Sequence, residues 1–117
     1  MLNESEIHQL AMKEVGDHLT KDGYDFLAVN SQLKKDPQFV CLKDQKIHFI
    51  VVRGCLYPDN PKKFDSKMME RIINHGIKYK ATTYFAGVGF ANARDYEMPL
   101  TKNDSYAVNF DGLQIME

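Results

Sequence analysis

Six basic side chains in the middle of the sequence occupy positions that suit phosphate binding. Arg53 ends an apolar stretch, and lysines precede it, follow it and begin the helical pattern after it. A guanidinium can bind a phosphate through two parallel hydrogen bonds, and lysine adds a mobile point charge. Amide donors at a helix N-terminus also favour anions. The predicted nucleic-acid-binding residues are Lys34, Lys35, Arg53, Lys62, Lys63 and Lys67.

The distribution of charge predicts a local binding surface. The 117 residues carry a net charge of −1, but residues 31–94 hold twelve Lys and Arg against five acids, a balance of +7. Residues 1–30 hold two Lys against six acids, and residues 95–117 hold one Lys against five. The neutral total argues against a bulk electrostatic binder of nucleic acid, whereas the middle segment leaves room for a basic patch. The alternative is that these lysines only solubilise loops and helix faces.

A cysteine paired with a histidine is the other chemistry that the residues offer. Cys41 and His48 face each other if a turn at Asp44-Gln45 joins their strands, and such a pair can activate a thiolate. Because no third group is evident to orient the imidazole, we favour a histidine that simply belongs to a strand face. Cys55 lies in a predicted loop, where nothing nearby argues for reactivity.

Length and composition predict one cytoplasmic domain over residues 1–117. Apolar residues make up 44% and charged residues 26%, which is typical of a globular chain. The sequence contains no run of about 18 apolar residues, the length that a membrane-spanning helix needs. The N-terminus has no basic region followed by an apolar run, so no secretory leader is predicted. Two cysteines make neither a disulfide framework nor a zinc site, which favours a reducing compartment.

Hydrophobic periodicity predicts the elements that must position these residues. Helical spacing predicts a helix over 4–21 and a second helix that begins at Asp65 or Ser66. Strands are predicted over 24–30, 38–42, 47–53 and 82–90, with a turn at 43–46, a loop over 54–65, and a terminal hairpin or strand pair over 106–110 and 113–116. Gly87 and Gly89 are expected to relieve crowding beneath a helix. This order predicts an α/β sandwich with a mixed sheet and a helix on each face.

Four segments carry a resemblance to a known family. Gly23-Tyr24 opens a strand that ends in Asn30, an apolar strand ends in Arg53, Asp65-Ser66-Lys67 begins a helix, and residues 106–111 form a closing strand. In order and spacing these segments resemble the PD-(D/E)XK nuclease superfamily, and within it the small bacterial Holliday-junction-resolvase-like endonucleases. The resemblance implies a restriction-endonuclease-like αβββαβ sandwich that forms a single nuclease-like domain.

The departures from that family fall on its catalytic positions. The family holds Mg²⁺ with an acid on the second strand and with the Glu of a Glu-x-Lys sequence on the third. The matching positions here are Gln38 or Phe39, Val51 and Arg53. Valine cannot ligate a hard cation, and arginine cannot be deprotonated. The resemblance therefore implies a degenerate nuclease without a metal site, and the prediction leans against an enzyme.

A displaced metal site would have to use other acids. Asp36, Asp44 and Glu70 are the nearest in sequence, and Mg²⁺ is predicted as a cofactor only if acids such as Asp36 or Glu70 have moved into the site. We favour the interpretation that Asp36, which precedes Pro37, belongs to a turn and that Glu70 lies on a solvated helix face. On that interpretation no cofactor is predicted.

Two classes of function stay open at the level of sequence. The first is a catalytically degenerate nuclease fold that binds DNA or RNA through the basic cluster. The alternative is a protein-interaction or structural module that acts as a homodimer, which the apolar Val51 supports. In that case Arg53 would pair with a nearby acid or be solvated. An active metal-dependent nuclease with displaced acids ranks third.

Overall fold

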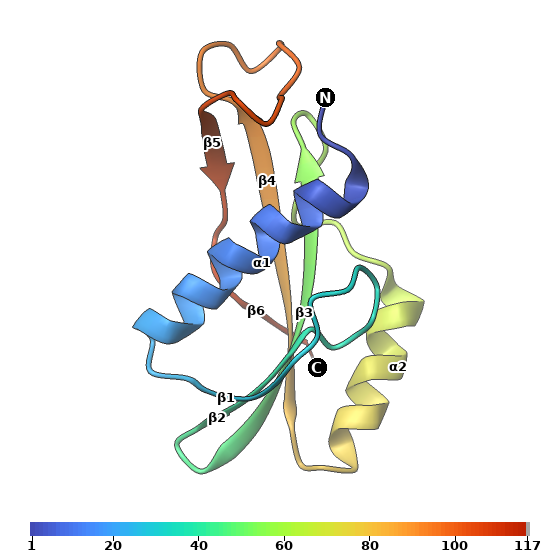
Figure 1. The fold of residues 1–117 in the computed structure, drawn as a ribbon. Coiled ribbons are helices and arrows are strands. Elements are labelled where there is room, and N and C mark those ends of the chain that lie inside the picture. The colour runs from blue at the N-terminus through green and yellow to red at the C-terminus, as the bar shows by residue number, and fades with distance from the viewer. Residues whose placement is uncertain (117) are drawn as a thin grey trace.

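The chain folds into a six-stranded mixed sheet with one helix on each face (Figure 1). The computed structural model describes residues 1–116. The elements are α1 (Glu4–Lys21), β1 (Asp25–Val29), β2 (Phe39–Lys43), β3 (Lys46–Leu56), α2 (Ser66–Ile77), β4 (Thr82–Asn92), β5 (Tyr106–Asn109) and β6 (Gln114–Met116). The predicted α/β sandwich of αβββαβ order is confirmed.

The sheet combines an antiparallel meander with one parallel pair. Its order is β1-β2-β3-β4-β5, in which β1, β2 and β3 pair antiparallel and β3 runs parallel to β4. The turn between β2 and β3 uses Asp44 and Gln45, both with positive φ, the geometry that a two-residue hairpin needs. The crossover from β3 to β4 passes through α2, as a parallel connection requires.

The terminal strands do not form a hairpin with each other, so that form of the prediction is wrong. Tyr106 to Asn109 pair with the C-terminal half of β4, and Gln114 to Met116 pair with its N-terminal half. Both strands therefore run antiparallel to β4 along the same edge, one after the other, and the chain does not reverse between them.

Helix α1 covers one face of the sheet and builds the larger core. Asn3 and Glu6 form the predicted capping box at its start. Its buried stripe contains Ala11, Met12, Val15 and Leu19, and none of these side chains is more than 7% exposed. The stripe packs on residues of β2, β3 and β4 that share one face, such as Ile50, Val52 and Val88.

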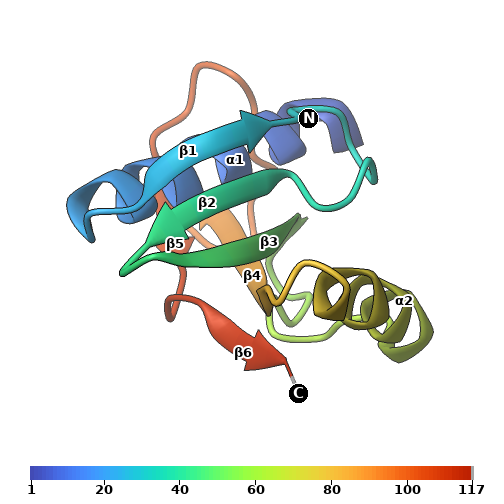
Figure 2. The ribbon, with the colours of Figure 1, turned by 90° about the horizontal axis from the view of Figure 1, so that it is seen from below.

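Helix α2 covers the opposite face next to β3 and β4, as Figure 2 shows from below. Met68 and Met69 pack there against Val51 and Phe85 in a smaller core. The alternation of Val51 with Val52 along β3 therefore supplies both cores, as expected for a strand covered on both sides.

Two glycines have structural reasons that differ from those predicted. Gly54 lies inside β3, which runs to Leu56, so the predicted loop begins too early. A Cβ at Gly54 would approach Ile7 and Ala11 of α1 to 3.0–3.1 Å, so glycine permits the close packing of α1 on β3. At Gly87 a Cβ would overlap the carbonyl oxygen of Pro61. The β4 glycines thus make room for the β3–α2 loop, not for a helix.

Candidate phosphate-binding cleft

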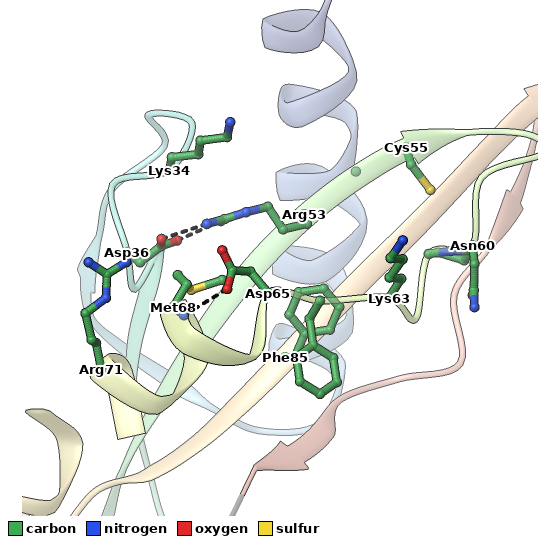
Figure 3. A pocket seen from close by; sticks show the side chains of 13 residues that line it. Lys34, Asp36, Arg53, Cys55, Asn60, Lys63, Asp65, Met68, Arg71 and Phe85 are labelled. Carbon is green, nitrogen blue, oxygen red and sulfur yellow. Dashed lines mark hydrogen bonds and ion pairs between the residues drawn. The ribbon is translucent and has the colours of Figure 1, made fainter. Parts of the chain in front are cut away.

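A cleft of about 630 Å³ lies between the β1–β2 loop, the C-terminal part of β3, the β3–α2 loop and α2, and Phe85 of β4 also lines it (Figure 3). Four cationic side chains line it, namely Lys34, Arg53, Lys63 and Arg71. They come from four separate segments, so only the tertiary fold brings them together. Two carboxylates, Asp36 and Asp65, line the same cleft.

Arg53 is held by Asp36 in a two-pronged ion pair. Its Nη1 donates to Oδ1 of Asp36 at 2.7 Å, and its Nη2 donates to Oδ2 at 2.7 Å. Nη1 also donates to the Val52 carbonyl at 2.9 Å. The side chains are 22% and 9% exposed for Arg53 and Asp36, so the pair is largely shielded from water. Arg53 is therefore engaged with a nearby acid, and its charge is neutralised within the cleft.

Gln38 connects this ion pair to the sheet. Its Oε1 accepts from the backbone N–H of Val52 at 2.7 Å, and its Nε2 donates to Oδ1 of Asp36 at 2.8 Å. Gln38 directly precedes β2, and its side-chain amide accepts the hydrogen bond from β3 that a backbone carbonyl of a neighbouring strand would otherwise accept. Gln38 is completely buried. An acid at this position could accept from Val52 but, when ionised, could not donate to Asp36.

The pKa of Asp36 reflects opposing effects. Burial by itself raises the pKa, but hydrogen bonds from Arg53 and Gln38 and the charge of Arg53 together hold it below its usual value. Asp36 is therefore ionised at neutral pH and serves as the counter-ion of Arg53. Asp36, which the sequence predicts as a turn residue, also lines the cleft and pairs there with Arg53.

Three cations of the cleft have no ion-pair partner among residues 1–116: Lys34, Lys63 and Arg71. Figure 3 shows that Lys34 comes from the β1–β2 loop, Lys63 from the loop before α2 and Arg71 from α2 itself. With Arg53 compensated by Asp36, a bound anion would meet the positive charges of these three side chains and the single negative charge of the Asp65 carboxylate. We call Lys34, Lys63 and Arg71 the cleft cations.

Three of the predicted basic residues do not line the cleft. Lys35, Lys62 and Lys67 are exposed and lie outside the cleft lining, and Lys62 Nζ pairs with Asp111 at 2.6 Å. The prediction also missed Arg71, which follows the cleft residue Met68 by three positions on α2 and so shares its helix face. That spacing could have identified Arg71 only if the face of α2 toward the cleft were known.

The N-terminus of α2 offers fewer free amides than expected. Asp65 is the N-cap, and its Oδ1 accepts from the backbone N–H groups of Lys67 at 3.0 Å and Met68 at 3.1 Å. A carboxylate of the chain therefore already occupies the position in which an anion would use these amides. The cationic character of the cleft therefore comes from its side chains and not from the helix end.

The positions that match the family's catalytic residues have structural roles. Val51 is completely buried in the core beneath α2, and Gln38 bridges Asp36 to β3. Of the two acids considered for a displaced site, Asp36 lines the cleft and Glu70 does not. Within residues 1–116, no three His, Cys, Asp or Glu side chains gather closely enough to hold a metal ion.

The thiols do not form an activated site. Cys41 pairs with His48 across β2 and β3 as the turn predicts, but His48 lies 3.1 Å from the Tyr84 hydroxyl and 3.3 Å from the Lys43 carbonyl. Burial raises the pKa of Cys41 to about 11, so this thiol is protonated at neutral pH. Cys55 lines the cleft. Burial raises the pKa of its thiol, and the negative charge of Asp59 raises it further by a smaller amount.

His8 is a buried residue of α1 whose ring nitrogens lack hydrogen-bond partners in the described part of the chain. Burial lowers its pKa, and the charge of Arg53 lowers it further against the opposing effect of Asp36. His8 is therefore neutral in the fold at neutral pH. Sequence reasoning missed it, because its burial depends on how α1 packs against the sheet.

His8→Leu is expected to stabilise the fold, and more so in acid. Removal of unpartnered polar atoms should raise the free energy of unfolding by about 1 kcal/mol near neutral pH. In the fold, the pKa of His8 lies below its usual 6.5. Protonation of His8 therefore does not reduce the free energy of unfolding above pH 6.5, but reduces it as the pH falls from 6.5 toward the folded pKa. Urea unfolding at about pH 7.5 and pH 5 should show a larger difference at the lower pH. An equal difference at both would contradict this assignment.

Fold and cleft together define an αβββαβ sandwich with a cationic cleft beside the C-terminal part of β3. The chain belongs to the family described as a domain of unknown function (DUF8840), whose profile matches residues 5–116. No curated protein and no solved structure matches the chain. No helix within residues 1–116 is both long and apolar enough to cross a membrane.

Proposed function

We propose that this protein binds nucleic acid in the cytoplasm, through phosphate contacts in the cleft, as a catalytically degenerate relative of the PD-(D/E)XK nucleases. The observation that carries the proposal is the convergence of the three cleft cations, Lys34, Lys63 and Arg71, in one cleft without carboxylate partners. The resemblance of the strand and helix order to that superfamily supports the choice of nucleic acid as the ligand.

The Asp36–Arg53 pair supports binding without cleavage. The carboxylate is committed to a guanidinium and to Gln38, so its oxygens already accept strong hydrogen bonds. A metal ion would have to compete with the positive charge of Arg53 for the same oxygens. No metal-dependent step is therefore included in the proposal.

Removal of the cleft cations should abolish most of the salt-dependent affinity. The variant Lys34→Gln/Lys63→Gln/Arg71→Gln keeps polar side chains at these positions and removes three charges. Its matched control, Lys35→Gln/Lys62→Gln/Lys67→Gln, removes three charges outside the cleft. In fluorescence anisotropy titrations with labelled DNA and RNA, the cleft variant should lose roughly tenfold or more in affinity, and its salt slope should flatten by about 2.

The control variant separates a site from a general charge effect. It should keep affinity within roughly threefold of the wild type, because these three side chains do not line the cleft and exposed charges act only weakly through salt solution. Equal losses in both variants would contradict a cleft-specific site. Failure of the wild type to bind any nucleic acid at low salt would overturn the proposed function.

Self-association is a second candidate, favoured by strand β1. This strand ends the sheet order, so the backbone groups of its outer edge are unpaired within the described sheet. Phe26, Leu27 and Val29 are 41–56% exposed, and no lysine or proline interrupts the strand. Native edge strands usually carry such protective features. An antiparallel pair of β1 strands from two copies is self-complementary and would bring Asp25 of one copy toward the Lys35 loop of the other.

Leu27→Lys should weaken such a dimer. Sedimentation velocity over a wide concentration range is expected to show a monomer–dimer equilibrium for the wild type and monomer for the variant. Ile77→Lys, on α2 and 63% exposed in the wild type, is the matched control and should behave as the wild type does. An apolar interface should respond little to salt. A wild type that stays monomeric at all concentrations would exclude this candidate.

A further inference from the structure

We infer that the cleft selects single-stranded over duplex nucleic acid, an inference that rests on the proposed function. The first observation is the lining between the cleft cations. Phe64, Met68 and Phe85 line the cleft together with Lys63 and Arg71. Duplex DNA presents mainly phosphates at its surface, whereas an unpaired nucleotide also offers an exposed base. An apolar lining between cations therefore matches a strand whose bases are free.

Phe64 is the residue placed to contact such a base. Its ring is only partly buried and packs on Phe85, which is 1% exposed, with the ring centroids 5.4 Å apart. The buried Phe85 fixes the inner side of the Phe64 ring. This arrangement leaves a held aromatic side chain at the wall of the cleft, the kind of platform on which bases stack without regard to sequence.

The size and charge of the cleft agree with a short unpaired segment. A volume of about 630 Å³ is in the range of sites that enclose small molecules, so it suits one or two nucleotides. Three uncompensated cations are few for a duplex binder, which typically makes about 6–10 phosphate contacts. For a single strand, three contacts predict a salt slope of about −2.1, or a roughly eighteenfold loss of affinity between about 50 and 200 mM salt.

Asn60 adds a polar group that is suited to a base edge. It lines the cleft beside Lys63, and its Oδ1 accepts from the backbone N–H of Lys62 at 3.0 Å. This bond orients the amide and leaves its Nδ2 donors for a ligand. The cleft cations provide charge for the phosphates, Phe64 a surface for the base and Asn60 a donor for the base edge.

The test compares a labelled single strand of about ten nucleotides with its duplex and with a mononucleotide, in anisotropy and competition titrations. The wild type should bind the single strand at least roughly tenfold more tightly than either competitor. Phe64→Leu keeps an apolar side chain but removes the ring. It should weaken single-strand binding about tenfold and leave the salt slope unchanged. Because loss of the Phe64–Phe85 contact also lowers stability, binding is measured where urea unfolding shows the variant to be fully folded. Ile72→Leu, a volume-matched change at the same core, should leave affinity unchanged.

Each failure has a distinct meaning. Equal or tighter duplex binding that still depends on the cleft cations overturns the single-strand inference and leaves the proposed function standing. A mononucleotide that binds as tightly as the strand also overturns the inference and assigns the cleft to free nucleotides. Absence of binding to all three ligands overturns both proposals.

Discussion

Val51→Glu is expected to lower the free energy of unfolding by about 3–5 kcal/mol, because it places a carboxylate without a partner in the core beneath α2. Val51 is completely buried against Met68, Met69 and Phe85, and none of these groups can pair with a charge. Urea unfolding measures the loss directly, and the midpoint should rise again as the pH falls and the carboxyl becomes protonated.

The same position tests the resemblance to the nucleases. In Val51→Glu/Arg53→Lys/Gln38→Asp, the acid and lysine types of the family stand at all three positions. If the correspondence is right, Mg²⁺ or Mn²⁺ should bind this variant in calorimetry and restore part of the lost stability. Val51→Thr, which replaces one methyl group by a hydroxyl of similar size, is the control and should cost about 1–2 kcal/mol without metal binding. A folded triple variant that binds neither metal would contradict the correspondence.

Gly87→Ala is expected to destabilise the fold by about 3 kcal/mol and to displace the β3–α2 loop. The added Cβ would overlap the carbonyl oxygen of Pro61, and a backbone atom cannot move without moving the loop. That loop carries Lys63 and Phe64 into the cleft. We therefore expect weaker nucleic-acid binding beyond the loss of stability, measured at a temperature where the variant is fully folded.

Gly89→Ala is the matched control on the same strand. A Cβ at Gly89 would meet Cγ of Pro61 at 3.3 Å, a side-chain atom that can shift by a few tenths of an ångström. The cost should stay below about 1 kcal/mol, and binding should be unchanged. Equal effects of the two substitutions would show that the loop does not depend on contact with Gly87.

Elements with strong local periodicity could be predicted from the sequence. The apolar spacing of α1 and the capping pair Asn3 and Glu6 fix that helix within the chain itself. The β2–β3 hairpin follows from two apolar strands around a short polar turn. The extent of β3 could not be predicted in the same way, because Gly54 signals a loop locally but serves the approach of α1, which is far away in sequence.

The cleft was only partly predictable for a similar reason. Lys34, Arg53 and Lys63 were identified as basic residues near the expected site, and the fold brings these three together. The pairing of Arg53 with Asp36 joins residues 17 positions apart, and it depends on Gln38 as well. No local pattern shows which basic residue of a cluster forms an ion pair and which does not. That Lys62 pairs with Asp111 could be known only from the fold, because the two residues are far apart in sequence.

The most direct test of the central claim is an NMR titration of isotope-labelled protein with a short single-stranded oligonucleotide. We predict that changes in amide chemical shift will cluster at Lys34, Lys63 and Arg71 and their sequence neighbours. In the variant Lys34→Gln/Lys63→Gln/Arg71→Gln, the oligonucleotide should no longer cause these changes. Strand β1 should not shift. Shifts that gather on β1 or elsewhere, or that persist in the cleft variant, would contradict the assignment of the cleft as the nucleic-acid site.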